Sequence, residues 1–439
     1  MQGKATKASS DANAEQQSQS THADSLKERY RAVRNFSATI CEPLVTEDYV
    51  IQSMPDVSPT KWHLAHTTWF FETFILKPCC PRYKEFHPRY GYLFNSYYVQ
   101  VGERHARPRR GLLSRPRVED VYAYRNHVDG YMAEWLETFA EKQSGTAALV
   151  ELGLNHEQQH QELIITDIKH VFSCNPLRPA YRKRESRPPI AVPPIRWVQF
   201  DGGLHEIGHD GADFAFDNET PRHQTYVPRF KLASRPITNG EYREFIDSGG
   251  YERPEIWLSD GWDAVMVQGW SAPLYWERVD GRWYVYTLDG MRELDESEPV
   301  CHVSYYEADA YARWAGARLP TEQELEIALR GEKIKGNLAE NGNFHPMPAD
   351  ARKGNKAPLQ MYGDLWEWTR SPYVPYPGYE PLPGAIGEYN GKFMCNQFVL
   401  RGGSCATSRS HIRPTYRNFF YPDARWQFSG IRVAKDVVD

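Results

Sequence analysis

The stretch that decides the fold of the N-terminal half runs from Glu151 to His170 and reads ELGLNHEQQHQELIITDIKH. His156 and His160 lie one turn apart on its apolar face. Two imidazoles in this arrangement can bind one metal ion, although two hydrogen-bonded core histidines would give the same pattern. The pair favours a metal site. The apolar residues that define the face recur at helical spacing: Leu149, Leu152, Leu163, Ile164 and Val171.

The letters from His156 to His160 also match H-E-x-x-H, the pattern of zinc metalloproteases. In such an enzyme Glu157 would act as general base, and a third ligand would usually follow downstream. A five-residue match occurs often by chance. The protease alternative therefore stays open until the rest of the chain has been considered.

Composition narrows the classes of protein. The chain has 439 residues with 52 Lys plus Arg and 57 Asp plus Glu, a formal net charge of −5, which argues against nucleic acid as the main partner. Its seven cysteines form no CxxC pair and predict neither a disulfide framework nor a zinc ribbon. No secretory segment or membrane-spanning run is present, so we expect a cytoplasmic protein without a membrane partner. The sequence indicates no oligomeric state.

Residues 1–24 are small and polar and predict a disordered tail. An amphipathic helix is expected from Ser25 to Ile40. A second helix should open at Ser58, an N-cap candidate followed by proline, and should place His66 on its inward stripe. His66 is then the natural third ligand, or else a core histidine between two tryptophans. His63 lies off the stripe, so we expect it to face elsewhere.

The stretch from Tyr83 to Arg117 is basic, aromatic and too long for an ordinary connection, and such loops are often functional. A long helix beginning at Val118 follows it, and then the helix that carries His156. Four helices predict an up-and-down bundle over residues 25–175 with ligands that project inward. The loop offers a tyrosine pair and an arginine cluster: Tyr97, Tyr98, Arg107, Arg109 and Arg110.

Residues 176–194 are rich in proline and basic side chains and predict a domain linker. Beyond it, residues 195–439 alternate short segments with Gly, Pro, Asn and Asp. This texture predicts an irregular, loop-rich α+β domain with little regular sheet. The helices expected in it are few: Asn239–Asp247, Glu307–Ala315 and Glu322–Leu329.

Both halves resemble known domains. The segments SPTKWHLAHTTWFFE (58–72) and HEQQHQE (156–162) resemble the three-histidine iron site of a DinB-like four-helix bundle. The second half resembles the formylglycine-generating-enzyme type of C-type-lectin-like domain. Its matching pieces are WVQFDGGLHEIG (197–208), FDNETPRHQTYVPRFKLASRPITNGEYREFI (216–246), PVCHVSYYEADAYARWAGARLPTEQELEIALRG (299–331), GDLWEWTRSPY (363–373), VLRGGSCATSRSHIRPTYRN (399–418) and FSGIRVAKD (428–436).

This fusion resembles the non-haem iron sulfoxide synthases of ergothioneine biosynthesis. Members of that family use O2 to couple a cysteine thiol to the imidazole of N-alpha-trimethylhistidine (hercynine), giving a sulfoxide. The formylglycine-generating enzyme itself needs a cysteine pair whose positions fall here at Thr407 and Ile412, with Cys405 alone nearby. The second domain is therefore expected to be a scaffold rather than a copper oxidase.

The resemblance implies roles for individual residues, and each role stays an expectation. Fe(II) would be held by His66, His156 and His160. Arg107 and Arg110 would bind the carboxylate of the thiol substrate, which is cysteine or gamma-glutamylcysteine. Hercynine would contact Gln159 and the loop residues Asn418, Phe419 and Phe420, whose rings suit a quaternary ammonium. Tyr97 or Tyr98 would donate a proton.

Two alternatives remain beside this reading. One is the ovothiol-type 5-histidylcysteine sulfoxide synthase, which joins cysteine to histidine at the other imidazole carbon. The rings of Phe419 and Phe420 favour hercynine, because a primary ammonium would prefer hydrogen-bond acceptors. The other is a non-catalytic metal-binding or thiol-binding module. A metalloprotease does not account for the lectin-like half.

Overall fold

The computed structural model describes residues 26–138, 144–183, 190–211, 213–350 and 357–437, and the predicted tail (residues 1–24) lies outside them. The chain forms two compact units that divide between Ile164 and Ile165. This division falls inside a long helix, whereas the sequence places the linker at residues 176–194, of which 184–189 are not described. The end of the helix packs with the second unit, where buried Lys169 lies 2.7 Å from His302 Nε2.

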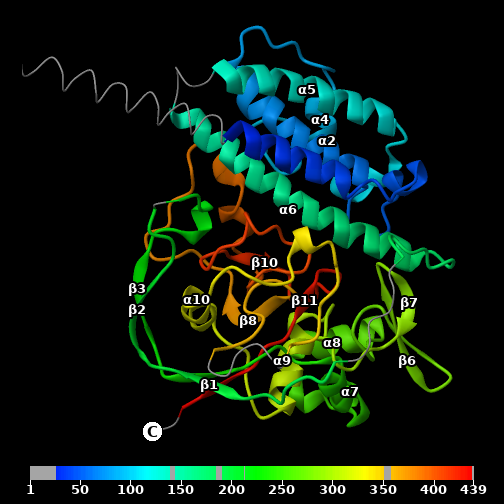
Figure 1. Cartoon of the computed structure of the whole chain (residues 1–439), viewed down its shortest axis with the longest axis vertical. Coiled ribbons are helices and arrows are strands. Elements are labelled where there is room, and N and C mark those ends of the chain that lie inside the picture. Colours follow the sequence, from blue (N-terminus) through cyan, green and yellow to red (C-terminus); the bar gives the residue numbers. More distant parts are fainter. Residues whose placement is uncertain (1–25, 139–143, 184–189, 212, 351–356, 438–439) are drawn as a thin grey trace, which may run out of the picture. The chain divides into compact units, whose positions relative to one another are not determined.

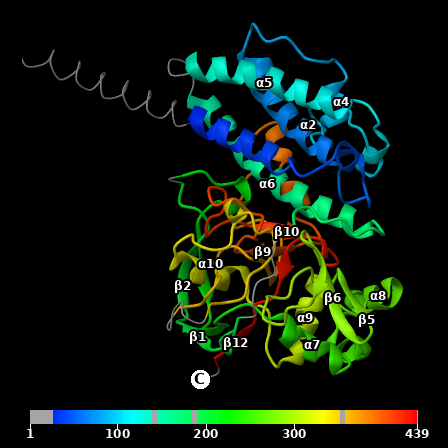
Figure 2. The same ribbon diagram turned by 45° about the vertical axis from the view of Figure 1, so that its right-hand side comes forward.

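Unit 1 is helical, and its long helices confirm the predicted bundle. A short α4 (Tyr90–Phe94) and the 3₁₀ turns η1 (Thr46–Val50) and η3 (Arg107–Leu112) lie in the connections. Figures 1 and 2 both show α5 running along α2, and the two helices are in contact. The long helices are residues 26–39, α2 (Thr60–Phe71) with its continuation through the π-turn η2 (Glu72–Leu76) and α3 (Lys77–Cys79), α5 (Val118–Thr138) and α6 (Ser144–Cys174).

Helix α2 is the core helix of this bundle. Every residue from Thr60 to Phe71 is buried, including Lys61, whose ammonium donates to the carbonyl of Pro116 at 3.0 Å. A helix with no solvent face needs no amphipathic stripe. The division of α2 into an inward and an outward side, which the sequence suggested, therefore does not exist.

A buried ion network joins the helices of unit 1. The carboxylate of Glu157 on α6 accepts from Arg34 Nη1 at 2.9 Å, from Ser37 Oγ at 2.6 Å and from Arg125 on α5. Arg34 also donates to Thr68 Oγ1 on α2 at 3.0 Å. Burial alone would raise the pKa of Glu157, but the guanidinium groups of Arg125 and Arg34 and the hydroxyl of Ser37 lower it to about 2. The carboxylate is therefore charged and fully paired.

Unit 2 is a mixed α+β domain, as predicted. The described residues form four small sheets, in the orders β1-β4-β12, β10-β9-β8-β11, β2-β3 and β5-β6-β7. Figure 2 shows β5 and β6 grouped with the helices α7 (Asn239–Asp247), α8 (Ser259–Gln268) and α9 (Tyr305–Trp314). The strands are β1 (Trp197–Phe200), β2 (Gly203–Ile207), β3 (His223–Val227), β4 (Phe230–Ala233), β5 (Trp276–Val279), β6 (Arg282–Thr287), β7 (Gly290–Glu293), β8 (Trp366–Pro372), β9 (Phe398–Arg401), β10 (Asn418–Phe420), β11 (Ser429–Gly430) and β12 (Ala434–Asp436).

The helices of unit 2 match the expected ones with one addition. Helix α7 (Asn239–Asp247) has the predicted bounds, and α9 (Tyr305–Trp314) and α10 (Glu322–Arg330) lie where helices were expected. Helix α8 (Ser259–Gln268) was not predicted. It contains Gly261, which lowers helix propensity and lies against Tyr306, where an added Cβ would come within 2.8 Å of the side chain. Helix α8 therefore forms because of its tertiary packing and not because of local helix propensity.

Buried Arg–Glu pairs hold the centre of unit 2 together. Arg401 donates to Glu322 and Glu326 at 3.0 Å each, and Arg417 donates to Glu322 at 2.9 Å. All four side chains are buried. Because Arg417 directly precedes β10, this pairing fixes the start of that strand. No helix in the described part of the chain combines the length and the apolar run that are needed to cross a membrane.

The Glu157 network predicts a pH-dependent stability. Replacing Glu157 by Gln should lower the free energy of unfolding at neutral pH by about 3–5 kcal/mol, because two buried guanidinium groups lose their carboxylate. The folded-state pKa is depressed, so the stabilisation is complete above the ordinary carboxyl pKa of 4.5 and is lost as the pH falls from 4.5 toward about 2. Urea unfolding of wild type and E157Q across this range measures it.

The matched control is Glu28→Gln, which changes an exposed carboxylate on the first helix. We expect E28Q to alter the free energy of unfolding by less than about 0.5 kcal/mol at any pH. Parallel pH profiles for wild type and E157Q would mean that Glu157 does not carry the stabilisation.

Candidate metal centre

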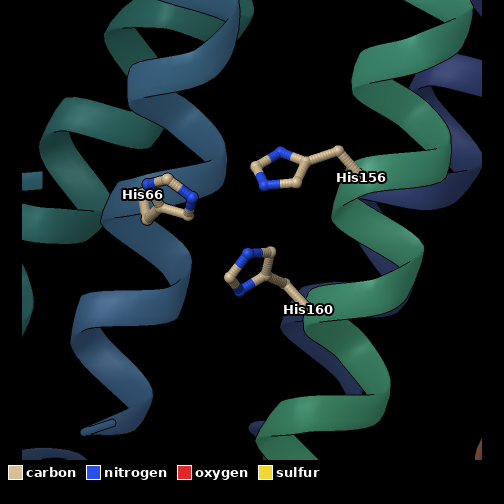
Figure 3. A group of neighbouring side chains, drawn as sticks. All are labelled: His66, His156 and His160. Carbon is tan, nitrogen blue, oxygen red and sulfur yellow. The ribbon is translucent and has the colours of Figure 1, made fainter. Parts of the chain in front are cut away.

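Three histidines from two helices meet inside unit 1. His66 projects from α2, and His156 and His160 project from successive turns of α6 into the same space (Figure 3). Their candidate ligand nitrogens all lie within 4.8 Å of one another. His66 and His156 are 0% and 1% exposed, whereas His160 is partly exposed. The structure thus brings together the three residues that the sequence singled out.

The hydrogen bond of His66 fixes its tautomer. Its Nδ1 lies 2.6 Å from the carbonyl oxygen of Phe94. A carbonyl can only accept, so Nδ1 carries the proton and Nε2 presents a lone pair. Among the described residues, that buried Nε2 has no hydrogen-bond partner. An orphaned buried lone pair aimed at two other imidazoles fits a metal ligand better than a satisfied core histidine.

Burial keeps all three imidazoles neutral. Burial is the main cause that lowers the pKa of His66 and His160 well below the usual value, with like-charge repulsion from the neighbouring histidines adding to it. Burial likewise lowers the pKa of His156 to about 3. Neutral imidazoles are the form that binds metals, and the set suits Fe(II), Zn(II) and Cu(II) alike. The donor set therefore fits a divalent transition metal.

The expectation that His63 faces elsewhere is wrong. His63 is 2% exposed, and its Nδ1 lies 2.8 Å from Nδ1 of His160. Residues three apart on a helix differ by only about 60° around the axis. Because α2 is buried on all sides, His63 reaches α6 beside His66. It does not belong to the group of mutually close ligand atoms.

Aromatic rings flank His66 on both faces. The ring of Trp62 stacks on it with centroids 4.6 Å apart, and the ring of Trp69 stacks on it at 5.5 Å. Tyr98 is fully buried and packs against Trp69 at 5.6 Å, so a single ring separates it from His66. Tyr97 stacks on Tyr98 at 4.7 Å and is partly exposed.

The two arginines singled out in the loop occupy different environments. Arg110 is buried, and its guanidinium carbon lies 3.3 Å from the centroid of the Trp62 ring. It donates to Ser58 Oγ at 2.9 Å and to Ser96 Oγ at 3.3 Å. Arg107 is exposed and donates to the carbonyl of Asp56. Arg110 is thus the one that lies next to the ring stack on His66.

The sequence did not reveal the two serine hydroxyls that accept hydrogen bonds from Arg110. Ser58 was expected to cap α2, but the helix begins at Thr60 without a side-chain cap. Ser58 instead accepts a hydrogen bond from Arg110, which comes from a segment 52 residues later in the chain. No local pattern reports a partner at that separation. Ser96 carried no signal beyond its position in the long loop.

The orientation of Glu157 rules out the metalloprotease alternative. A general base must face the substrate side of the metal with an available lone pair. Glu157 instead turns into the buried network with Arg34, Arg125 and Ser37, and its low pKa removes its basicity at neutral pH. In the H-E-x-x-H segment, Glu157 therefore has a structural role between two histidines that could bind a metal.

The expected substrate residues of unit 2 lie on strand β10. Asn418, Phe419 and Phe420 are all partly exposed and pair with β9. The ring of Phe419 stacks on Tyr373 with centroids 4.0 Å apart and an angle of 9°, so one of its faces is covered. The ring of Phe420 meets Trp426 edge-on at 5.9 Å. In unit 1, the remaining expected residue, Gln159, is partly exposed on α6 directly before His160.

The positions where a formylglycine-generating enzyme needs its cysteine pair hold other buried side chains. Thr407 and Ile412 are 1% and 3% exposed, and Thr407 Oγ1 accepts from the amide of Ser404 at 2.7 Å. Cys405 is buried and is not part of a disulfide. Unit 2 therefore lacks the thiol pair at the positions where that chemistry needs it.

Comparison with family models matches both units. Residues 189–437 match the sulfatase-modifying factor enzyme 1-like domain, and residues 29–164 match the DinB superfamily. Among solved structures, PvdO from Pseudomonas aeruginosa matches 56% of this chain and 100% of its own, at 18% identity and a TM-score of 0.37, which is too low to support an argument. The two family models agree with the architecture of the two units.

Comparison with characterised proteins covers the whole fusion. The hercynine oxygenase of Mycolicibacterium smegmatis is 34% identical over 88% of this chain and 93% of its own length. That of Mycolicibacterium thermoresistibile is 33% identical over 87% of this chain and 88% of its own. Ergothioneine biosynthesis protein 1 of Schizosaccharomyces pombe is 29% identical over 54% of this chain and 29% of its own. The chain belongs to the hercynine oxygenase family of enzymes.

Proposed function

We propose that this enzyme joins the thiol of cysteine, or of gamma-glutamylcysteine, to the imidazole C2 of hercynine and oxidises the sulfur. One thiol, one imidazole C–H and one O2 give one sulfoxide and one water. C–S bond formation and sulfur oxidation each supply two electrons, which together reduce O2 fully. The observation that carries the proposal is the buried, neutral three-histidine cluster in a chain whose relatives are named hercynine oxygenases.

We propose Fe(II) as the metal held by His66, His156 and His160. When bound there, iron would supply O2 activation and a site for the thiolate. Three neutral ligands leave the full charge of the divalent ion in place, which favours an anionic sulfur ligand and the loss of its proton at neutral pH. The protein's part is to hold three lone pairs in a site that excludes bulk water.

Arg110 is our candidate for binding the carboxylate of the thiol substrate. Its positive charge is buried one ring away from His66, and Ser58 and Ser96 orient its guanidinium plane. A guanidinium fork suits a carboxylate better than an ammonium does. Arg107 would act from the surface as the second member of the pair.

Gln159, Asn418, Phe419 and Phe420 are the proposed hercynine residues. The ring of Phe419 stacks on Tyr373 at 4.0 Å and on Phe393 at 6.1 Å, and this partly exposed group of rings would receive the trimethylammonium. The amide of Gln159 would hydrogen-bond the imidazole of hercynine. Tyr98 is the proposed proton donor, because it is buried and packs against the ring that covers His66.

The proposed reaction is tested by incubating the full chain with Fe(II), cysteine, hercynine and O2 and analysing the products by mass spectrometry. We expect one product that contains both substrates, less two hydrogens and plus one oxygen. NMR should show the imidazole C5 proton retained, because sulfur enters at C2. His156→Ala is the inactive control. A histidine-derived product that dominates when histidine competes at equal concentration would indicate the ovothiol-type reaction instead.

Removing the phenol of Tyr98 should separate oxygen activation from C–S coupling. We expect Tyr98→Phe to bind both substrates normally and to form sulfoxide roughly 100-fold more slowly, because it lacks a general acid. Oxidation of the thiol alone to a sulfinic acid should then increase. Tyr97→Phe is the matched variant. If both variants form sulfoxide at the wild-type rate, neither phenol takes part in the reaction.

The rings of β10 should act on one substrate only. Replacing Phe419 and Phe420 together should raise the apparent KM for hercynine by roughly tenfold and leave that for cysteine unchanged, because about 1–2 kcal/mol of cation–π attraction is lost. The double Leu variant keeps the apolar volume but not the rings, so it should behave like the double Ala variant. A normal KM in the Leu variant would mean that the rings serve packing alone.

A further inference from the structure

His63 contacts the metal centre without belonging to it. It projects from α2 one turn before His66, is buried, and places its Nδ1 2.8 Å from Nδ1 of His160. The two rings are 5.1 Å apart between centroids and inclined by 55°. We propose that His63 is a positioning residue whose Nδ1 accepts a hydrogen bond from His160 Nδ1–H and thereby commits His160 to binding metal through Nε2. This inference rests on the proposed metal site.

The number of protons on the two rings links their hydrogen bond to metal binding. A hydrogen bond between two imidazole nitrogens needs one donor and one acceptor, and each neutral ring carries a single N–H. If His160 Nδ1 donates, its Nε2 has the lone pair and can ligate. If His63 donates instead, the proton of His160 must sit on Nε2, which then cannot ligate. His160 can therefore bind metal through Nε2 only when His63 accepts the hydrogen bond from its Nδ1–H.

His66 gives an internal comparison. Its Nδ1–H is bonded to the carbonyl of Phe94, a group that can only accept, so its tautomer is fixed whether or not metal is bound. His63 can either accept or donate. His160 is therefore the ligand whose tautomer depends on its partner, and metal binding selects the productive tautomer. Partners of this kind orient ligands and tune their affinity, commonly by 10- to 100-fold.

A neutral imidazole partner also has a chemical consequence. A carboxylate in the same place would draw the proton of His160 toward itself and add negative charge to the ligand set. With His63 as acceptor, all three ligands stay neutral. The charge of the bound ion then remains available to stabilise an anionic thiolate substrate.

Three substitutions distinguish the role of His63 as a hydrogen-bond acceptor from a role in packing. His63→Leu removes the acceptor and keeps an apolar side chain. His63→Asn places an amide oxygen close to the former position of Nδ1 and should restore acceptance. His127→Leu is the matched control, because His127 lies on α5 and bonds the carbonyl of Lys84, outside the cluster.

The experiment titrates each metal-free, full-length protein with Co(II) and records the proton NMR spectrum of the complex. We expect His63→Leu to weaken Co(II) binding by about 10- to 100-fold, and His63→Asn and His127→Leu to stay within about threefold of wild type. Exchangeable Nδ1–H signals of coordinated histidines are shifted outside the normal spectral range. The His160 signal should vanish or exchange rapidly in His63→Leu alone, whereas the His66 signal should persist.

Two results would overturn the proposal. One is wild-type Co(II) affinity and an unchanged His160 signal in His63→Leu. The other is an Asn variant as weak as the Leu variant, which would assign His63 to packing. The wild-type titration reports separately on the metal site itself. If wild type binds no Co(II), the three histidines do not form a divalent-metal site, and the proposed role of His63 is overturned together with that site. Thermal unfolding of the metal-free variants checks that each is folded.

Discussion

The geometry of the three-histidine group depends on the rotational position of helix α6, and the buried charge of Glu157 helps to set that position. Glu157 follows His156 directly, and consecutive residues on a helix point about 100° apart. Arg34 and Arg125, from two other helices, form ion pairs with the Glu157 carboxylate on one side of α6. His156 and His160 are thereby directed to another side, where α2 presents His66. Rotating α6 to remove the histidines would leave the buried carboxylate of Glu157 without its cations and Arg125 without its carboxylate, which is strongly unfavourable, whereas Arg34 would keep its ion pair with Asp129.

The three histidines are neutral, whereas Glu157 and its arginine partners are charged, although both groups are buried in the same bundle. The difference lies in the partners. Glu157 has two cations and a hydroxyl within hydrogen-bonding reach, so charge is retained. The histidines face one another and aromatic rings, so burial keeps each imidazole neutral, with a single N–H. A cluster of lone pairs without a counter-charge is a poor structural core but a good receptor for a divalent cation.

Much of this architecture is predictable from the sequence, because α6 is amphipathic and its histidines share its apolar face. The bundle, the inward placement of His156 and His160 and helix α7 follow from periodicity and capping residues. The position of His63 does not, because α2 is buried on every side and its periodicity carries no information about direction. Nor do the contacts between Arg110 and Ser58 or between Phe419 and Tyr373, which join residues far apart in the chain. The H-E-x-x-H pattern around Glu157 was misleading for the same reason, because the side chains that bind its carboxylate lie on other helices.

We propose that the three imidazoles of His66, His156 and His160, and no other side chain of the described residues, hold a catalytic iron. X-ray absorption spectroscopy of the Fe(II)-loaded protein under anaerobic conditions tests it most directly. The account predicts scattering from three imidazole rings in the wild type and from two in His66→Ala, with a sulfur neighbour that appears only after cysteine is added. Sulfur or carboxylate ligation in the absence of substrate, or a wild-type spectrum from His66→Ala, would contradict it.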